Sequence, residues 1–435
     1  MTQTVIDNVR IFDGITDRLS EPMNVRVLGN VIDAVSVEAI DAEGCDVIDG
    51  GGRTLMPGLI DAHMHYDINM DFAELSARAD RSDLAIRSVE VAQRTLMDGF
   101  TSTRDTGGSP FALKRAIDRG DIAGPRIYPS GPMISQTSGH GDFGCNCRPN
   151  PHLTGNHTLD AWEVLGLAHI VDGRDQVLAA VRQNLRQGAS QIKIMGGGGG
   201  SSPWDPIDTT QFTTDEWSAA VEAAEDWGTY VCTHIFTPRA VNRALDAGVK
   251  SLEHAFFLDR PTVERIAEEG AFVVPQAWGM SPEVLKNPNL DPAKIEPVRQ
   301  LQAAYADVPK WLVECGVKVA FASDLLGTFD DGQLSRRYEL HWRAVMYESN
   351  FEVLRQATSV AGELLALSGP RNPYPGKLGV VEEGALADLL IVDGNPLEDM
   401  AALGASPVWT GAPPPEPIES IRLIMKDGAL YKHTL

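Results

Sequence analysis

The chain begins with short segments in which apolar and polar residues alternate. TVIDNVRIFDG, MNVRVLGNVIDAVS and DVIDGGGRTLMPG follow one another within residues 1–56, and turns rich in glycine separate them. Alternation with a period of two is typical of strands that bury one face. Similar segments return within residues 370–435, at GALADLLIVDGNP and IESIRLIMKDGALYKH. Because neither piece is long enough to bury a core alone, we expect both to form one small β-sandwich domain together.

The middle of the chain, residues 57–369, alternates short apolar runs with helical stretches. Eight runs are expected as strands, in the order LIDAHMH, FTSTRDTG, RIYPSGP, QIKIMG, TYVCTH, VKSLEH, AFVVPQ and KVAFASD. The clearest helix is TTDEWSAAVEAAEDWG, where Thr213 and Glu216 predict a capping box and Gly228 predicts the end of the helix. Strands that alternate with helices indicate a parallel sheet. Eight such units predict an α/β fold, a (β/α)8 TIM-type barrel.

Composition and charge narrow the class of partner. Of 435 residues, 43% are hydrophobic and 22% charged, as in an ordinary soluble globular protein. The net charge of −23 repels phosphate backbones and anionic membranes, so neither nucleic acid nor a membrane is expected as a partner. The first residues lack a basic region followed by an apolar run, and no apolar stretch is long enough to span a bilayer. These features predict a cytoplasmic protein that acts on a small molecule.

The cysteines are few and odd in number: Cys45, Cys145, Cys147, Cys232 and Cys315. This number argues against a disulfide framework and favours a reducing compartment. Cys145 and Cys147 form a C-x-C pair in a region that also holds His140, His152 and His157. The pair could be an additional metal clip, but a loop element of small residues is the favoured interpretation.

Polar residues stand at or near the C-terminal ends of several expected strands. In chain order they are His63, His65, Lys193, His234, His254 and Asp324. In a parallel barrel these ends form the catalytic face, so all six side chains would point to one place. An H-x-H pair alone is a weak signal that arises by chance. It becomes specific when later strands supply two more histidines and an aspartate in this order.

These six side chains have the chemistry of a site for two metal ions. Imidazole suits zinc and similar divalent ions, and carboxylate fills the remaining positions. An ammonium group beside two cations would be expelled, so Lys193 must be neutral or converted. Reaction with CO2 turns it into a carboxylated lysine, an anionic group that can bridge both ions. The expected cofactors are therefore two divalent ions, zinc by preference, together with carboxylated Lys193.

Two adjacent ions predict hydrolysis by a metal-activated water. They would lower the pKa of a shared water and clamp a carbonyl oxygen. Asp324 can ligate one ion, accept the proton of that water and deliver it to a leaving nitrogen. Such an amidase or peptidase needs no serine or cysteine nucleophile, and no G-x-S-x-G motif competes. The glycine run 196–200 lacks the Lys-Ser/Thr of a phosphate loop.

At this point the chain resembles the amidohydrolase superfamily over essentially its whole length. The motifs that carry the resemblance are PGLIDAHMH, the lysine of QIKIMG, the two later histidines, the Ser-Asp of KVAFASD and GALADLLIVDGNPL. The segments SQTSGHGDF, SSPWDPIDTTQFTTDE and THIFTPRAV resemble the imidazolonepropionase-related branch, with its prolidases, Xaa-Arg carboxypeptidases and ochratoxin-type amidases. The resemblance implies that His63 and His65 bind one ion with Asp324, and that His234 and His254 bind the other.

The resemblance also suggests substrate contacts. His140, in the loop SGHGD, would polarise the substrate carbonyl or hold a substrate carboxylate. Arg239 could pair with a substrate carboxylate in bidentate fashion. One position departs from the family, because Phe236 stands where many peptidase relatives have a tyrosine. The lost hydroxyl favours a substrate more hydrophobic than a plain dipeptide.

The predicted function is hydrolysis of an amide C–N bond, with a dipeptide (Xaa-Pro-like) or an N-acyl amino acid as the lead substrate. The alternative is an amidase for carbamates, ureas or aromatic amides, for which no carboxylate is needed. A metal-free scaffold and a deaminase are weaker alternatives, because the six ligands are intact and deaminases of this type usually lack the bridging lysine. Barrels of this size often form rings or dimers, so a homo-oligomer is expected.

Overall fold

Both ends of the chain contribute to one large sheet. The computed structural model describes residues 3–147, 150–155, 158–286 and 295–435. The sheet contains eight strands in the order β18-β17-β16-β5-β1-β2-β3, and β4 also pairs with β1. Its strands are β1 (Gln3–Ile11), β2 (Pro22–Leu28), β3 (Val31–Ser36), β4 (Asp46–Asp49), β5 (Thr54–Pro57), β16 (Leu389–Val392), β17 (Ile421–Lys426) and β18 (Ala429–His433). The antiparallel pair β5–β16 joins the two terminal segments, so both contribute strands to one sheet.

The eight runs predicted as strands, together with two strands that were not predicted, β9 and β10, form two parallel sheets. One has the order β6-β7-β8 and the other β10-β9-β11-β12-β13-β14-β15. Their strands are β6 (Leu59–Met64), β7 (Phe100–Asp105), β8 (Arg126–Pro129), β9 (Met133–Ser135), β10 (Ala168–Ile170), β11 (Ile192–Met195), β12 (Val231–Ile235), β13 (Ser251–His254), β14 (Phe272–Val274) and β15 (Lys318–Val319). All pairings within both sheets are parallel, as the alternation of strands and helices predicted.

Backbone hydrogen bonds join the edges of these two parallel sheets. On one side, Phe321 accepts from the amide of Ala62 at 2.8 Å, and the amide of Asp324 donates to the carbonyl of His63 at 2.7 Å. On the other side, the amide of Ser190 donates to the carbonyl of Pro129 at 2.8 Å. The run KVAFASD thus lies along β6, although only its first two residues are assigned as the strand β15.

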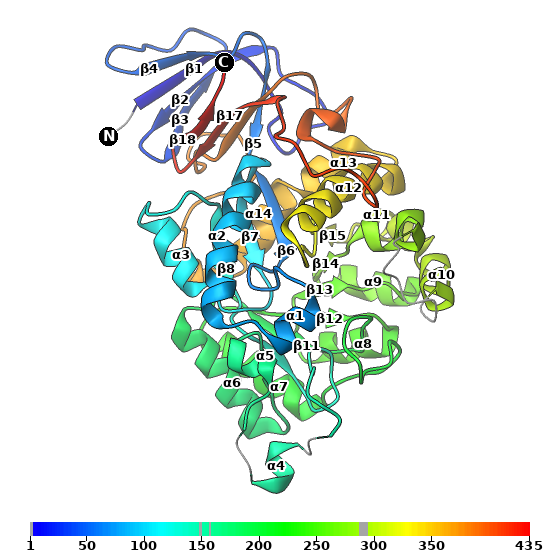
Figure 1. Ribbon diagram of the computed structural model, residues 1–435. Helices are drawn as coiled ribbons and strands as arrows, with labels where there is room; N and C mark the ends of the chain where they lie inside the picture. Colours follow the sequence, from blue (N-terminus) through cyan, green and yellow to red (C-terminus); the bar gives the residue numbers. More distant parts are fainter. Residues whose placement is uncertain (1–2, 148–149, 156–157, 287–294) are drawn as a thin grey trace.

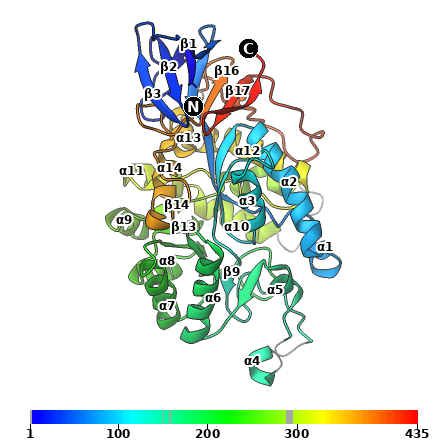
Figure 2. The same ribbon diagram turned by 90° about the vertical axis from the view of Figure 1, so that its left-hand side faces the viewer.

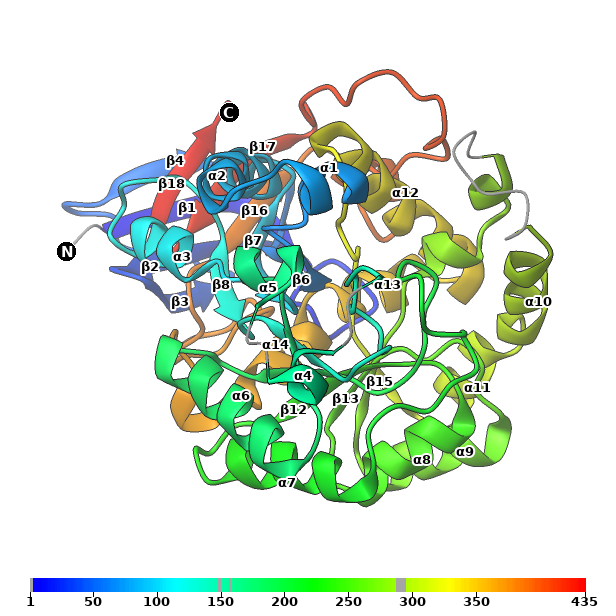
Figure 3. The ribbon, with the colours of Figure 1, turned by 60° about the horizontal axis from the view of Figure 1, so that its bottom comes forward.

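Helices lie around the outside of the parallel strands (Figure 3). They are α1 (Phe72–Ala77), α2 (Arg81–Met97), α3 (Phe111–Asp118), α4 (Pro151–Thr154), α5 (Ala161–Leu165), α6 (Arg174–Gln187), α7 (Thr214–Glu225), α8 (Pro238–Asp246), α9 (Arg260–Glu268), α10 (Ile295–Tyr305), α11 (Val308–Glu314), α12 (Phe329–Tyr347), α13 (Asn350–Gln356) and α14 (Ser359–Ala366). The terminal sheet lies at one end of the molecule, and α6 and α7 lie toward the other (Figures 1 and 2). Among the described residues, none of these helices is both long and apolar enough to cross a membrane.

Helix α7 illustrates how local chemistry positions these elements. Thr213 and Glu216 form the predicted capping box, in which Glu216 accepts from the backbone amide of Thr213 at 2.7 Å. Its apolar face is buried, with Trp217 fully covered. The helix ends at Glu225, and Gly228 completes the turn with a φ of 72° that a residue with a side chain rarely adopts. The amphipathic pattern therefore fixes which face of α7 covers β11 and β12.

Candidate metal centre

Three of the predicted ligands converge on one point. The Nε2 atoms of His63 and His65 each lie 3.3 Å from Oδ1 of Asp324. One potential ligand atom from each residue lies within 4.8 Å of the other two. His63 lies on β6 and His65 directly follows it, and Asp324 comes from the segment that follows β15, which lies along β6. The hydrogen bonds that join the sheet edges therefore also build this cluster.

A buried ion pair holds the first of these histidines. Nδ1 of His63 lies 2.7 Å from Oε2 of Glu253, whose carboxylate accepts two hydrogen bonds of 2.8 Å from Arg104. Ser251 donates a further hydrogen bond to the same carboxylate at 2.6 Å. The charge of Arg104 and the hydrogen bond from His63 outweigh burial, so the pKa of Glu253 is lowered. An ionised Glu253 accepts a hydrogen bond from Nδ1 of His63 and directs Nε2 of the same ring toward Asp324.

The other two strand-end histidines lie against this cluster. The ring centroids of His254 and His63 are 5.0 Å apart, and those of His254 and His234 are 4.5 Å apart. Burial, followed by the charge of His63, lowers the pKa of His254 to about 3, and burial also holds the pKa of His234 well below its ordinary value. Nδ1 of His254 lies 2.5 Å from Oε1 of Gln276. Both rings therefore favour the neutral form that binds metals.

Lys193 lies on β11 and is 1% exposed. Burial lowers its pKa, which favours the neutral amine that can react with CO2. Asp324 shows the opposite balance: burial raises its pKa, but the charge of His63 and hydrogen bonds from His63 and His65 outweigh that effect. The pKa of Asp324 is therefore lowered, and its carboxylate stays ionised. The donor set thus combines four imidazoles, of which His234 and His254 have a lowered pKa, with a lysine of lowered pKa and an ionised carboxylate, a set that fits divalent cations.

All six predicted ligands line one cavity of about 510 Å³. His140 and Phe236 line it as well. The structure does not bring Arg239 to this place, because Arg239 is exposed on the first turn of α8. Among the described residues that line the cavity there is no arginine, and Lys193 is its only lysine. The carboxylate contact expected from Arg239 is therefore not formed by the side chains seen here.

Aromatic rings form two walls of the cavity. On one side, Phe143 stacks on Trp162 with centroids 3.9 Å apart, and Phe72 contacts both rings. On the other side, Phe236 lies 5.2 Å from Phe256, centroid to centroid. Phe72 lies on α1, Trp162 lies on α5 and Phe143 lies in a loop, and none of the three was singled out from the sequence.

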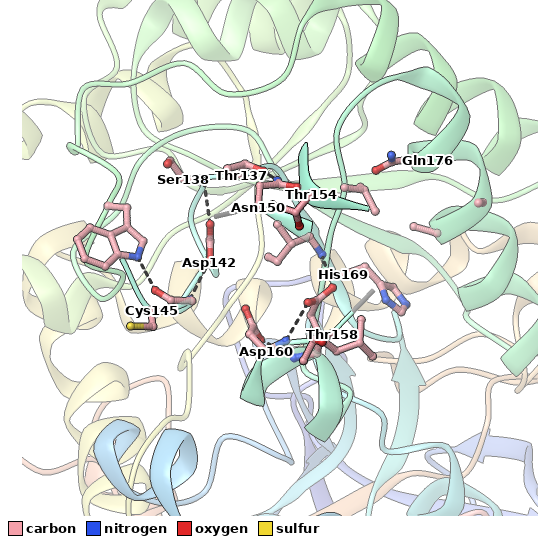
Figure 4. Close-up of a pocket in the computed structure, with 18 of the residues that line it drawn as sticks. Thr137, Ser138, Asp142, Cys145, Asn150, Thr154, Thr158, Asp160, His169 and Gln176 are labelled. Atoms are coloured by element: carbon pink, nitrogen blue, oxygen red, sulfur yellow. Dashed lines mark hydrogen bonds between the residues drawn. The ribbon is translucent and has the colours of Figure 1, made fainter. Parts of the chain in front are cut away.

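A second cavity, of about 1030 Å³, is lined by residues that include Asp142, Cys145 and His169 (Figure 4). Trp204 lines this cavity, and its Nε1 donates to the carbonyl of Gly144 at 3.0 Å. Cys145 and Cys147 are joined in a disulfide at the same place, so they do not form a metal clip. The other three cysteines are free, and no disulfide links distant segments of the chain. His157, part of the suggested clip, lies outside the described residues.

Three further polar residues support the site but were not singled out in the sequence. Glu253 and Arg104 hold His63, and Asp205 holds His140. The position of Glu253, directly before His254 in SLEH, was a possible signal. Nothing local marks Arg104 or Asp205, because each reaches its partner across the fold.

Comparison with known proteins agrees with this geometry. A curated relative, ochratoxinase of Aspergillus niger, is 29% identical over 371 residues, which cover 82% of this chain and 74% of that protein. A solved prolidase, crystallised with N-methylphosphonate-L-proline, is 34% identical with a TM-score of 0.86 and covers 99% of this chain and 100% of its own. A solved Xaa-Pro dipeptidase with bound methionine is 30% identical with a TM-score of 0.82, at 99% and 100% coverage.

The family model described as the amidohydrolase family matches residues 54–420. This range contains both parallel sheets and every predicted ligand. The fold, the converging donors and this match together establish a hydrolytic enzyme, and the chain belongs to the amidohydrolase family.

Proposed function

We propose that this enzyme uses two metal ions to hydrolyse the amide bond of small peptides or N-acyl amino acids that carry apolar groups. The observation that carries the proposal is the convergence of six metal-compatible side chains on one buried cavity with aromatic walls. The names of the solved relatives, a prolidase and a Xaa-Pro dipeptidase, support a substrate of this kind.

The proposal includes the architecture that would hold the site. We infer that the two hydrogen-bonded parallel sheets close into the (β/α)8 barrel expected for residues 57–369. Residues 1–56 and 370–435 would then form the β-sandwich domain beside it. The hydrogen bonds at both sheet edges support this arrangement.

Two divalent ions fit the donor set. His63, His65 and Asp324 would hold one ion, and His234 and His254 the other, with carboxylated Lys193 between them. The lowered pKa values of His234, His254 and Asp324 support this assignment. Zinc is the preferred ion, because it favours imidazole and carboxylate ligands. When bound, such ions supply Lewis acidity that acidifies a water and polarises an amide carbonyl.

The chain's own residues would move the proton and place the substrate. Asp324 takes up the proton of the attacking water as the C–O bond forms. It then delivers that proton to the leaving nitrogen as the C–N bond breaks, which yields a carboxylic acid and an amine; the acid proton then passes to the amine or to solvent. His140 would hydrogen-bond the substrate from the opposite loop, and the aromatic walls would exclude bulk water and hold the apolar groups.

A second candidate function is hydrolysis of neutral aromatic amides, carbamates or ureas. One observation favours it: the described residues lining the cavity include no arginine, and Lys193 is a candidate ligand. A substrate carboxylate would then meet no fixed cation other than the histidines and ions. The relative named ochratoxinase is also consistent with an aromatic amide.

A matched pair of substrates separates the two candidates. N-benzoyl-L-phenylalanine and N-benzoylphenethylamine share the amide and both rings, and only the first carries a carboxylate. We expect the zinc-loaded enzyme to hydrolyse the first with a kcat/KM at least about tenfold higher, a difference of roughly 1.4 kcal/mol. Equal values would favour the neutral amides. Hydrolysis of neither compound, nor of a panel of dipeptides, by protein that holds metal would overturn the amide proposal.

We also propose a cytoplasmic location and a homo-oligomeric state. Among the described residues the one disulfide joins the neighbouring Cys145 and Cys147, and the other three cysteines are free, so no disulfide framework argues against a reducing compartment. Large apolar side chains stand exposed on neighbouring elements, with Ile86 71% exposed on α2 and Val164 53% exposed on α5, which is consistent with contact between subunits. Light scattering coupled to size exclusion would measure the oligomeric state directly.

A further inference from the structure

The side chain of His140 is held on every side although it stands in a loop. Its ring stacks on that of His234, with centroids 3.9 Å apart and planes 15° from parallel. Its backbone amide donates to Oε1 of Gln211 at 2.9 Å, and the next amide, of Gly141, donates to Oγ of Ser202 at 3.0 Å. Only 8% of His140 is exposed. The loop between β11 and α7 thus closes over this histidine.

The two ring nitrogens of His140 have different partners. Nδ1 lies 2.8 Å from Oδ2 of Asp205 and 2.7 Å from Oγ of Ser202, whereas Nε2 lies 3.3 Å from Oγ of Ser201. A carboxylate only accepts hydrogen bonds, so the proton of the His140–Asp205 contact belongs to Nδ1. Nε2 is then the nitrogen left to meet a substrate in the cavity.

The same oxygen of Asp205 ties down the glycine run. Oδ2 accepts from the backbone amide of Gly199 at 2.7 Å. A Cβ atom at Gly199 would lie 2.1 Å from Cε1 of His140, and one at Gly198 would lie 1.9 Å from the carbonyl oxygen of Pro206. Gly199 therefore lets the backbone pass directly against the histidine ring, and Gly198 lets it pass against the carbonyl of Pro206. One buried carboxylate oxygen joins the loop, its glycine turn and the imidazole.

We propose that Asp205 is a positioning residue that acts through His140. It fixes the proton on Nδ1, turns Nε2 toward the substrate, and keeps the glycine run packed against the ring. This inference rests on the proposed function, because His140 is there the residue that contacts the substrate. The side chain of Asp205 is itself fully buried, with 0% exposed, so it acts from behind the histidine.

A proton NMR experiment tests the hydrogen bond without any substrate. We expect the Nδ1 proton of His140 to give a signal downfield of the backbone amides, since it is buried and bonded to a carboxylate. The signal should disappear in His140→Asn and in Asp205→Asn. It should remain in Asp208→Asn, a matched control, because Asp208 is an exposed aspartate of the same loop. Persistence of the signal in Asp205→Asn would overturn the proposal.

A double-mutant cycle tests whether Asp205 works through His140. We expect Asp205→Asn to lower kcat on the order of tenfold to a hundredfold, with a smaller change in KM and unchanged metal content, as for partners of functional histidines. In the background of His140→Asn, the same substitution should have almost no further effect on kcat. Asp205→Glu keeps the carboxylate and should recover part of kcat.

The outcomes separate this inference from the proposed function. If no amide is hydrolysed but the NMR signal depends on Asp205, the proposed function fails and the positioning of His140 stands. If losses from Asp205→Asn and His140→Asn multiply in the double variant, Asp205 only organises the loop and the inference fails. Melting temperatures near that of the parent enzyme would show that each variant is folded.

Discussion

Two candidate ligands adopt a backbone conformation that their residue types rarely choose. His254 has a φ of 67° and Asp324 a φ of 48°, both in the left-handed region. Such conformations cost free energy and persist only where the surroundings impose them. Both residues end a strand or the segment that continues one, and the unusual φ turns each side chain into the cavity. The strain is consistent with a preformed site.

Among single residues, Asp324, the proposed proton carrier, offers the most direct test of the mechanism. We expect Asp324→Asn to fold but to lower kcat on the order of a thousandfold, because the amide cannot carry the proton and is a poorer ligand. Steady-state kinetics with zinc-loaded protein, together with metal analysis, would measure both effects. A variant that retains more than about a tenth of kcat would contradict the role given to Asp324.

The lysine offers a chemical rescue. We expect Lys193→Ala to lower activity on the order of a hundredfold, since the group proposed to bridge the two ions is gone. Acetate or propionate should restore part of the activity by occupying the space that the side chain left. Full activity without added acid would show that no bridge is needed, and absence of rescue with intact metal content would argue against a carboxylated lysine.

At the scale of elements, Arg126 at the start of β8 connects the parallel strands to the terminal sheet. Its guanidinium lies 3.1 Å from the carboxylate of Asp388, just before β16, and 2.7 Å from that of Asp427, in the turn between β17 and β18. Side chains of Arg126 and Asp388 are 6% and 3% exposed. Removing one partner of such a buried pair leaves the other charge uncompensated.

We therefore expect Arg126→Met to destabilise the protein by roughly 3 kcal/mol, as measured by urea unfolding. A suitable control is Arg119→Met, because Arg119 pairs with Asp121 at the surface and is 61% exposed. That control should change the free energy of unfolding by less than about 1 kcal/mol. Similar values for both variants would show that the contact between the sheets contributes little.

The ion pair between Arg126 and Asp427 makes the stability of the protein depend on pH. Burial raises the pKa of Asp427, but the charge and hydrogen bond of Arg126 outweigh burial, and its pKa is lowered on folding. The group therefore contributes stability that is present above the ordinary aspartate pKa of about 3.9 and is lost as pH falls through the lower folded value.

The free energy of unfolding, measured at a series of acidic pH values, should show this loss of stability as the pH falls. We expect the parent protein to be more stable than Asp427→Asn near neutral pH, with a difference that shrinks below about pH 4. Asp46→Asn, at an exposed position of β4, should show no such trend. A difference that grows on acidification would contradict the assignment.

The sequence predicted the elements better than their exact limits and side-chain contacts. The order of the eight predicted strands along the chain and the capping box of Thr213 were predictable, because hydrophobic periodicity and helix caps are local features of a sequence. The short β15 was not, because the rest of its run bonds to β6 across the chain rather than extending the ladder. Glu253 and Asp205 were also missed, since their partners lie 190 and 65 residues away in sequence.

At the scale of the whole molecule, bound metal would join distant parts of the chain. His63 lies on the first parallel strand in the chain and Asp324 follows the last one. The two residues meet where the two parallel sheets are hydrogen-bonded to each other. Metal that binds only the folded state stabilises it, by about 2.7 kcal/mol when free metal exceeds its Kd a hundredfold.

We expect a chelator to lower the melting temperature and to increase hydrogen exchange in β6 and in the segment after β15. Added zinc should reverse both changes. A His63→Asn, His65→Asn double variant serves as the control, because its melting temperature should respond much less to zinc. An unchanged melting temperature after confirmed metal removal would show that the contact between β6 and the segment after β15 is stable without ions.

The pairing of β5 with β16 has a consequence for how the protein is made. Thr54–Pro57 leaves the ribosome well before its partner Leu389–Val392 exists. At about 5–20 residues per second, the intervening chain takes on the order of tens of seconds to synthesise. During that time β5 carries an unpaired edge, so nascent chains stalled before β16 should be cleaved near β5 by proteases that spare the finished enzyme. The terminal sheet is therefore the last part of the molecule to be completed.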